Sequence, residues 1–156
     1  MKNPIRLLMY LPVPWVFVLT YLIGAGLEHC APIGLWDMTA PRVRVVGYVL
    51  FALGAAIAGW SLLIFHRLHT TTVPGKTSTS LVTRGPYRFS RNPMYVGLIL
   101  AYLGEAGILN QVWPILLLPL VIAYLNWIVI PVEEARLTEV FGADYEQYRA
   151  KVRRWM

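Results

Sequence analysis

Residues 93–130 read PMYVGLILAYLGEAGILNQVWPILLLPLVIAYLNWIVI, and this stretch decides the fold. Two apolar runs, 93–109 and 112–130, are separated only by the polar pair Asn110-Gln111. A helix needs roughly 20 residues to cross a hydrocarbon core of about 30 Å, so the second run is long enough and the first, which contains Glu105, is marginal. Because two residues leave no room for a longer loop, the stretch predicts a tight antiparallel helical hairpin.

The rest of the chain is also unusually apolar. Of its 156 residues, 57% are hydrophobic and only 14% are charged, against roughly 45–50% and about 25% in typical globular proteins. A soluble domain of this length has too much surface to leave so few charges outside. The sequence therefore predicts an all-α integral membrane protein, a single domain of residues 1–156 with about four transmembrane helices, at 5–27, 43–65, 93–109 and 112–130.

The distribution of charge predicts the orientation of these spans. The net charge is +6, and the loop 66–92 contains no acid but five bases: Arg67, Lys76, Arg84, Arg88 and Arg91. Because basic loops stay in the cytoplasm, we expect this loop and both termini there, and the neutral loop 28–42 outside. The bases flank apolar spans instead of lining one soluble face, so the bilayer is the expected partner and a nucleic acid is not.

Both ends of the chain depart from a simple span. The first apolar run starts with basic residues, but it is long and carries Pro12 and Pro14, so we expect a retained span and not a cleaved signal peptide. After Pro131 the chain becomes charged, and the apolar residues of the tail 131–156 recur at helical spacing, with Gly142 as a break between two short helices. Such an amphipathic tail lies on the bilayer surface or folds back over the cytoplasmic mouth of the bundle.

Two polar segments are candidates for chemistry. In the connector 76–97, Asn92 is a natural helix cap and Pro93 suits the first helical position. A helix N-terminus can receive a carboxylate or another anion; the alternative is a capped helix anchored to lipid headgroups by basic residues. Glu133-Glu134 directly follows the fourth span, as a solvated helix start or as carboxylates that bind ribose hydroxyls or an amine. Neither segment alone identifies a reaction.

Together the two segments form a recognisable pattern. The connector reads Leu81-Val82-Thr83-x-Gly85-x-Tyr87 and then Arg91-Asn92-Pro93-x-Tyr95-x-Gly97. The tail reads Glu133-Glu134-x-x-Leu137-x-x-x-Phe141-Gly142-x-x-Tyr145-x-x-Tyr148-x-x-x-Val152. This order and spacing, over residues 79–152, resembles the isoprenylcysteine carboxyl methyltransferase family and its bacterial relatives. It is also similar to phospholipid N-methyltransferases.

The resemblance implies a membrane methyltransferase that uses S-adenosylmethionine and releases S-adenosylhomocysteine, in a bacterial inner membrane. It implies a cofactor enclosed by the last helices, the connector and the folded-back tail, with Glu133 at a polar end, Tyr87 or Tyr95 against the adenine, and the Asn92 region at the carboxylate. By position, the implied cofactor contacts are Thr79, Ser80, Leu81, Val82, Tyr87, Asn92, Pro93, Met94, Tyr95 and Glu133.

The implied reaction needs little acid–base catalysis. The sulfonium makes the methyl group electrophilic, so a positioned nucleophile and exclusion of water account for much of the rate. A thiolate or carboxylate acceptor needs no general base, whereas an amine must first lose a proton. We therefore assign no catalytic base.

Two departures from the family pattern leave the substrate open. Members that act on prenylcysteine usually have histidine where this chain has Asn92, and arginine where it has Val129. The acceptor is expected to be a lipophilic or membrane-associated small molecule, and a phospholipid headgroup amine is the alternative. Less favoured are a sterol-reductase-like enzyme with a nicotinamide cofactor and a non-catalytic membrane scaffold.

Three further residues are given structural interpretations. His66 and His69 lie at the end of the second span, but two histidines are too few for a zinc site, so we expect hydrogen bonds at the membrane interface and no metal. An acid inside a span is often functional. Glu105, however, lies near the outer end of its helix, so it is interpreted as a boundary or helix-contact residue, with a functional role left open.

Overall fold

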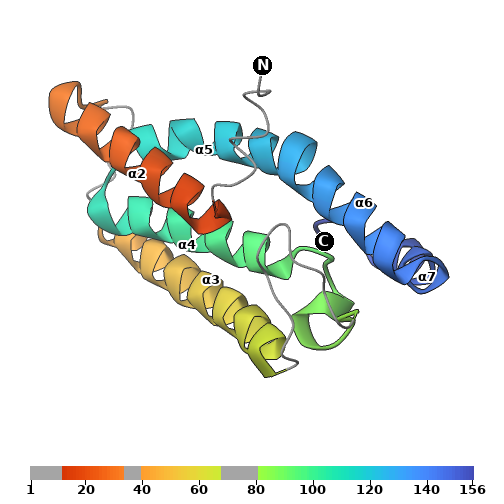
Figure 1. Cartoon of the computed structure of the whole chain (residues 1–156). Helices are drawn as coiled ribbons and strands as arrows, with labels where there is room; N and C mark the ends of the chain where they lie inside the picture. The colour runs from red at the N-terminus through yellow and green to blue at the C-terminus, as the bar shows by residue number, and fades with distance from the viewer. Residues whose placement is uncertain (1–11, 34–39, 68–80) are drawn as a thin grey trace, which may run out of the picture.

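A computed structural model describes residues 12–33, 40–67 and 81–156 of the chain, and these residues form helices and no strand. The helices are α2 (Val13–Cys30), α3 (Pro41–Arg67), the short 3-10 helix η1 (Gly85–Arg88), α4 (Pro93–Leu109), α5 (Trp113–Tyr124), the π-helical turn η2 (Leu125–Val129), α6 (Ile130–Phe141) and α7 (Ala143–Lys151). Consecutive long helices run in opposite directions (Figure 1). Thr79, Ser80, His69 and the beginning of the first predicted span lie outside the described residues.

The prediction of an all-α multi-pass membrane protein is confirmed. Three helices of the described chain are long and apolar enough to cross a bilayer: α2, α3 and the continuous helix Trp113–Phe141. α4 has 17 residues, the range of the third predicted span, and at 1.5 Å per residue it is roughly 26 Å long. This shorter helix packs against α2, α3 and α5 in the middle of the bundle, which shields much of it from lipid.

The tightest packing in the bundle joins α3 to α4. A Cβ atom added to Gly47 would lie 2.8 Å from the carbonyl oxygen of Gly104, and one added to Gly97 would lie 2.6 Å from the backbone nitrogen of Ala58. The two backbones therefore approach closely along antiparallel helices, as small residues allow in membrane interfaces. Large apolar side chains cover other faces of α3, including Val45, Val46, Leu62 and Leu63, which are exposed as lipid-facing residues are.

The hairpin turn between α4 and α5 is as tight as the sequence predicts. Asn110 adopts the left-handed conformation (φ 56°, ψ 45°) and the backbone N–H of Gln111 donates to the carbonyl of Ala106 (2.9 Å). Glu28, at the end of α2, caps the next helix: its Oε2 accepts hydrogen bonds from the backbone N–H groups of Val112 (2.8 Å) and Trp113 (2.9 Å). The end of the bundle that contains this hairpin turn is thereby closed by a carboxylate on backbone amides.

The helix of the fourth predicted span continues beyond the expected boundary at residue 130. The helix that begins at Trp113 passes through Pro131 and ends only at Phe141. Proline lacks an N–H and its ring clashes with the carbonyl four residues earlier. The π-helical turn Leu125–Val129 lies directly before it and widens the helix there, which relieves the clash.

The tail folds back onto the bundle, the second of the two predicted arrangements. Gly142 has φ 49° and separates α6 from α7, as predicted. After α7 the chain returns to the connector, where the backbone N–H of Arg91 donates to the carbonyl of Arg153 (2.9 Å). The C-terminus therefore lies beside the beginning of α4 (Figure 1).

Candidate functional site

Four polar side chains from four elements meet at the end of the bundle where the tail returns. The centre is a hydrogen bond from the hydroxyl of Tyr95, in the first turn of α4, to Oε1 of Glu133 on α6 (2.6 Å). Tyr95 is 4% exposed, and Glu133 is partly buried. A carboxylate in such surroundings must be hydrogen-bonded, and the tyrosine hydroxyl supplies one donor.

Tyr87, from η1, completes this group together with Ser61 of α3. Its buried ring lies edge-on to Phe65, with the ring centroids 5.4 Å apart. Burial raises the pKa of the Tyr87 hydroxyl; the nearby Ser61 side chain, whose hydroxyl donates to the carbonyl of Ile57 (2.7 Å), opposes this shift, and Tyr148 and the Glu133 carboxylate add to it. The hydroxyl therefore stays protonated. We call Ser61, Tyr87, Tyr95 and Glu133 the polar cluster.

The tail holds Tyr87 from the other side. The hydroxyl of Tyr148 on α7 donates to the backbone carbonyl of Tyr87 (2.7 Å). Burial raises the pKa of Tyr148, and neighbouring Tyr145 raises it further, so this donor keeps its proton. The connector residue Tyr87 is thus fixed between α3 and α7.

Apolar candidates adjoin the polar cluster in sequence. Val82 and Pro93 are buried, and Leu81 and Met94 are partly buried. Met94 also packs against the hydrophobic core formed by α2, α4 and the helix Trp113–Phe141. The connector and the first turn of α4 therefore combine aromatic, apolar and acidic side chains at one end of the molecule.

The predicted position of Asn92 before the first helical residue, Pro93, is confirmed, but the predicted cap by its side chain is wrong. Asn92 does occupy the N-cap position of α4, but its side chain makes no capping hydrogen bond. Its amide Nδ2 instead donates to the carbonyl of Arg154 (2.9 Å), and its backbone N–H donates to Oγ of Ser90 (3.1 Å). The side chain of Asn92 therefore links the start of α4 to the tail and does not cap the helix.

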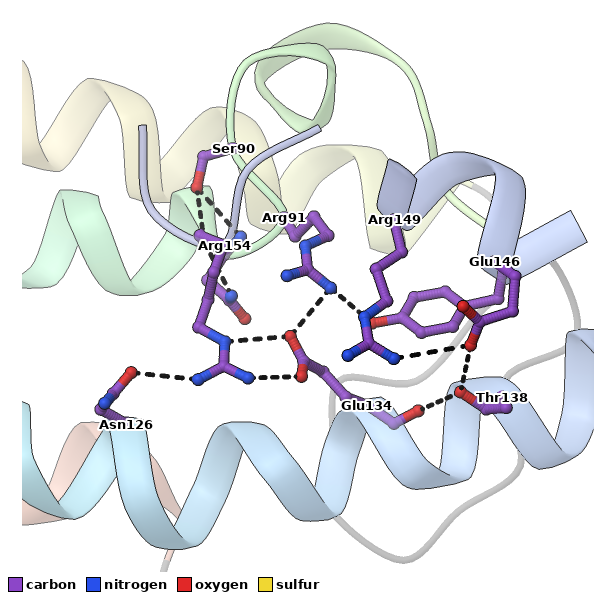
Figure 2. Close-up of polar contacts among 10 residues, drawn as sticks. Ser90, Arg91, Asn126, Glu134, Thr138, Glu146, Arg149 and Arg154 are labelled. Carbon is purple, nitrogen blue, oxygen red and sulfur yellow. Dashed lines mark hydrogen bonds and ion pairs between the residues drawn. The ribbon is translucent and has the colours of Figure 1, made fainter. Parts of the chain in front are cut away.

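Glu134 has a different role from Glu133, because successive residues of a helix point about 100° apart. Its carboxylate forms ion pairs with Nη1 of Arg91 (2.9 Å) and Nη2 of Arg154 (2.7 Å), as Figure 2 shows. The Glu134 side chain is 12% exposed and that of Arg91 is 11% exposed. Glu134 is therefore an internal ionic link, and Glu133 alone faces Tyr95.

Sequence reasoning missed several residues that build this end of the molecule. Ser61 reads as an ordinary small residue within an apolar span, and Arg154 as one of many charges in the tail. The contacts of Arg154 with Ser90 and Glu134 join residues distant in sequence. The spacing of the tail tyrosines, together with the prediction that the tail folds back, is the signal from which Tyr145 and Tyr148 could have been inferred.

The remaining candidates lie elsewhere. Val129 is 8% exposed and belongs to the hydrophobic core, so this position supplies no cation. Glu105 is exposed on α4, about three turns beyond Tyr95. Within the described ranges, no three His, Cys, Asp or Glu residues lie together as a metal site requires.

Several known proteins are similar in sequence to part of this chain. In fission yeast, Schizosaccharomyces pombe, a protein-S-isoprenylcysteine O-methyltransferase is 43% identical over 72 residues, which are 46% of this chain and 30% of the relative. Probable protein-S-isoprenylcysteine O-methyltransferases of the indica and japonica subspecies of Oryza sativa are each 31% identical over 108 residues, 69% of this chain and 54% of the relative. The chain thus spans about half, or less, of the length of these relatives. No solved structure matches it.

A sequence model of one family covers most of the described structure. The model, described as phospholipid methyltransferase, matches residues 43–144. These residues include almost all of α3, the connector, α4, α5 and α6, and therefore every member of the polar cluster. The match extends over well more than half of the chain, which belongs to the phospholipid methyltransferase family.

Proposed function

We propose that this protein is an integral membrane methyltransferase that transfers a methyl group from S-adenosylmethionine to a lipophilic or membrane-associated small molecule. The observation that carries the proposal is the hydrogen bond between Tyr95 and Glu133, because both residues occupy positions that the family pattern assigns to the cofactor. Membership of a methyltransferase family and the names of the relatives support the reaction type.

The side chains at this end suit the chemistry of the cofactor. The Glu133 carboxylate, with Oε1 occupied by Tyr95, has a second oxygen that can accept from ribose hydroxyls or an ammonium group. Tyr87 and the apolar side chains Val82 and Met94 suit an adenine ring. When bound, the cofactor supplies an electrophilic methyl group on a sulfonium, and the protein's task is to orient it and exclude water.

The methyl acceptor is less well defined than the methyl donor. The relatives named above are isoprenylcysteine O-methyltransferases. Position 129 nevertheless holds a buried valine and not the arginine that members acting on prenylcysteine usually have there. This absence of a cation favours a second candidate, N-methylation of a phospholipid headgroup amine. Assays with radiolabelled S-adenosylmethionine on prenylated thiols, prenylcysteine carboxylates and phosphatidylethanolamine separate these acceptors.

We further propose that the polar cluster lies at the cytoplasmic side of a bacterial inner membrane, where a soluble cofactor is available. The single cysteine, Cys30, is exposed at the opposite end of the bundle and gives a direct test. A membrane-impermeant maleimide should label Cys30 in intact cells. In a Cys30→Ser background, Gln147→Cys on α7 should react only after permeabilisation. The reverse pattern would overturn this orientation.

Cofactor binding is the decisive test of the function. Calorimetric titration of the detergent-purified protein with S-adenosylhomocysteine should show micromolar binding, with no binding of NADPH. Glu133→Gln should weaken binding by about tenfold or more, because a charge-assisted contact is lost. Glu139→Gln, on an exposed position of the same helix, is the matched control and should bind as the wild type does. A folded wild type that does not bind would contradict the proposal and favour a scaffold.

A further inference from the structure

The last residues of the chain are hydrogen-bonded to the segment from which α4 begins, next in sequence to Tyr95 of the proposed cofactor site. The backbone carbonyl of Arg153 accepts a hydrogen bond from the N–H of Arg91 (2.9 Å). The carbonyl of Arg154 accepts two more, from Oγ of Ser90 (3.2 Å) and from Nδ2 of Asn92 (2.9 Å). Three hydrogen bonds thus attach the tail to the segment from which α4 and Tyr95 begin.

The side chain of Arg154 attaches the same segment to α6. Its Nε and Nη2 donate to the two oxygens of Glu134 (3.1 and 2.7 Å), and its Nη1 donates to Oδ1 of Asn126 (3.2 Å). Figure 2 shows this fork, with Arg91 reaching the same carboxylate from the connector. Two-pronged pairing of a guanidinium with a carboxylate fixes direction as well as distance.

The charges around Glu134 act on one another. Arg91 and Arg154 both pair with Glu134, and Glu133, on the adjacent position of α6, is influenced by Glu134 and by Arg136. Removing Arg154 leaves Glu134 paired with Arg91 alone, so the repulsion between Glu134 and the neighbouring Glu133 carboxylate is less fully compensated. The orientation of Glu133 toward Tyr95 therefore depends on how Glu134 is held.

On the basis of the proposed function, we infer that Arg154 is a positioning residue for cofactor binding. It contacts no member of the polar cluster among the described hydrogen bonds, and acts through Glu134 and through the connector. By fixing Glu134 it sets the rotation of α6, and hence the direction of Glu133. By holding Ser90 and Asn92 it keeps the start of α4, with Tyr95, against α6.

The test compares Arg154→Ala with Arg149→Ala in the full-length protein. Arg149 forms an exposed ion pair with Glu146 (3.5 Å), so its removal is a matched loss of charge from the tail. Arg154→Ala should raise the Kd for S-adenosylhomocysteine and the KM for S-adenosylmethionine by about tenfold. The kcat at saturating cofactor should change by less than about twofold, since a positioning defect is overcome once the cofactor is bound. Arg149→Ala should alter none of these values.

Two further variants separate positioning from general stability. Arg154→Lys keeps the charge but not the fork, so its Kd should lie between those of the wild type and Arg154→Ala. If Arg154 acts through Glu134, combining Arg154→Ala with Glu134→Gln should weaken binding less than the product of the two single effects. Should Arg154→Ala fail to fold, Arg154→Lys alone carries the test, since its Kd should still exceed that of the wild type.

Three outcomes would overturn the inference. These are wild-type affinity in Arg154→Ala, or in Arg154→Lys if that variant carries the test; independent, multiplicative effects in the double variant; and an equal loss of affinity in Arg149→Ala. Failure of the wild type itself to bind S-adenosylhomocysteine is a different result, since it overturns the proposed function before any variant is compared.

Discussion

The two ends of the bundle each use glutamate, but in opposite ways. At the end with the α4–α5 hairpin turn, Glu28 accepts hydrogen bonds from two backbone N–H groups at the start of α5 and so completes the hairpin. At the other end, Glu133 binds a tyrosine hydroxyl and Glu134 binds two arginines, all from separate elements. Glu28 satisfies the backbone N–H groups of one helix, whereas Glu133 and Glu134 bring side chains from several elements together around the proposed site. The comparison separates a carboxylate that stabilises from one available for binding.

The largest effect is expected when the close packing of α3 against α4, which supports both ends of the bundle, is disrupted. In Gly97→Ala, the new Cβ would lie 2.6 Å from the backbone nitrogen of Ala58, so α3 and α4 must move apart. We expect the free energy of unfolding to fall by about 3 kcal/mol, at the upper end of the cost of overpacking. Thermal unfolding in detergent measures this. Gly59→Ala, whose Cβ would meet nothing within 4 Å, is the matched control and should leave the unfolding temperature nearly unchanged.

A smaller effect should appear only at the binding end. Tyr95→Phe removes the hydroxyl that donates to Glu133 and leaves the ring in place. We expect the Kd for S-adenosylhomocysteine to rise by about tenfold, because the carboxylate loses its fixed partner. Titration calorimetry checks the affinity, and Tyr48→Phe, on an exposed tyrosine of α3, is the control. Equal affinities in Tyr95→Phe and the wild type would remove Tyr95 from the site.

The complementary effect should appear only in stability. Glu28→Ala leaves the N–H groups of Val112 and Trp113 without their acceptor, and should cost roughly 1–2 kcal/mol of unfolding free energy. The Kd for S-adenosylhomocysteine should not change. Glu28→Gln keeps an oxygen that can accept the same hydrogen bonds and should recover part of the loss. A weakened cofactor affinity in Glu28→Ala would end the proposed division between the two ends.

The smallest effect is expected for Glu105. This carboxylate is exposed on α4 and lies toward the end of the bundle with the hairpin turn. Glu105→Ala should leave both the unfolding temperature and methyl transfer within experimental error of the wild type. A clear loss of activity with unchanged stability would reveal a functional acid in the half of the bundle with the hairpin turn, and the comparison of the two ends would then need a third site.

Local signals account for what the sequence predicts correctly. The hairpin could be predicted because its two helices and its turn are determined by residues close together in the sequence, namely the two apolar runs and the Asn110-Gln111 pair. The continuation of the last helix through Pro131 could not be predicted, since a proline at a change of composition normally indicates a helix end, and the compensating π-helical turn has no sequence signal of its own.

Part of the candidate site could likewise be predicted from the sequence, and part could not. Tyr87, Tyr95 and Glu133 are found through a pattern of spacing, and the structure brings their side chains together with Ser61. Whether they bind the cofactor stays a prediction. The role of Arg154 depends on a tail that crosses back to Ser90 and Glu134, and long-range contacts of this kind leave no periodicity in a single sequence.

The unbroken helix from Trp113 to Phe141 also makes the protein sensitive to the thickness of its membrane. A helix whose apolar part is longer or shorter than the surrounding hydrocarbon adapts by tilting. Because the same helix carries Glu133 and Glu134 beyond its apolar part, a tilt moves both carboxylates relative to the connector. Lipid acyl-chain length is thereby coupled to the geometry of the proposed site, and activity in bilayers of graded thickness should pass through an optimum.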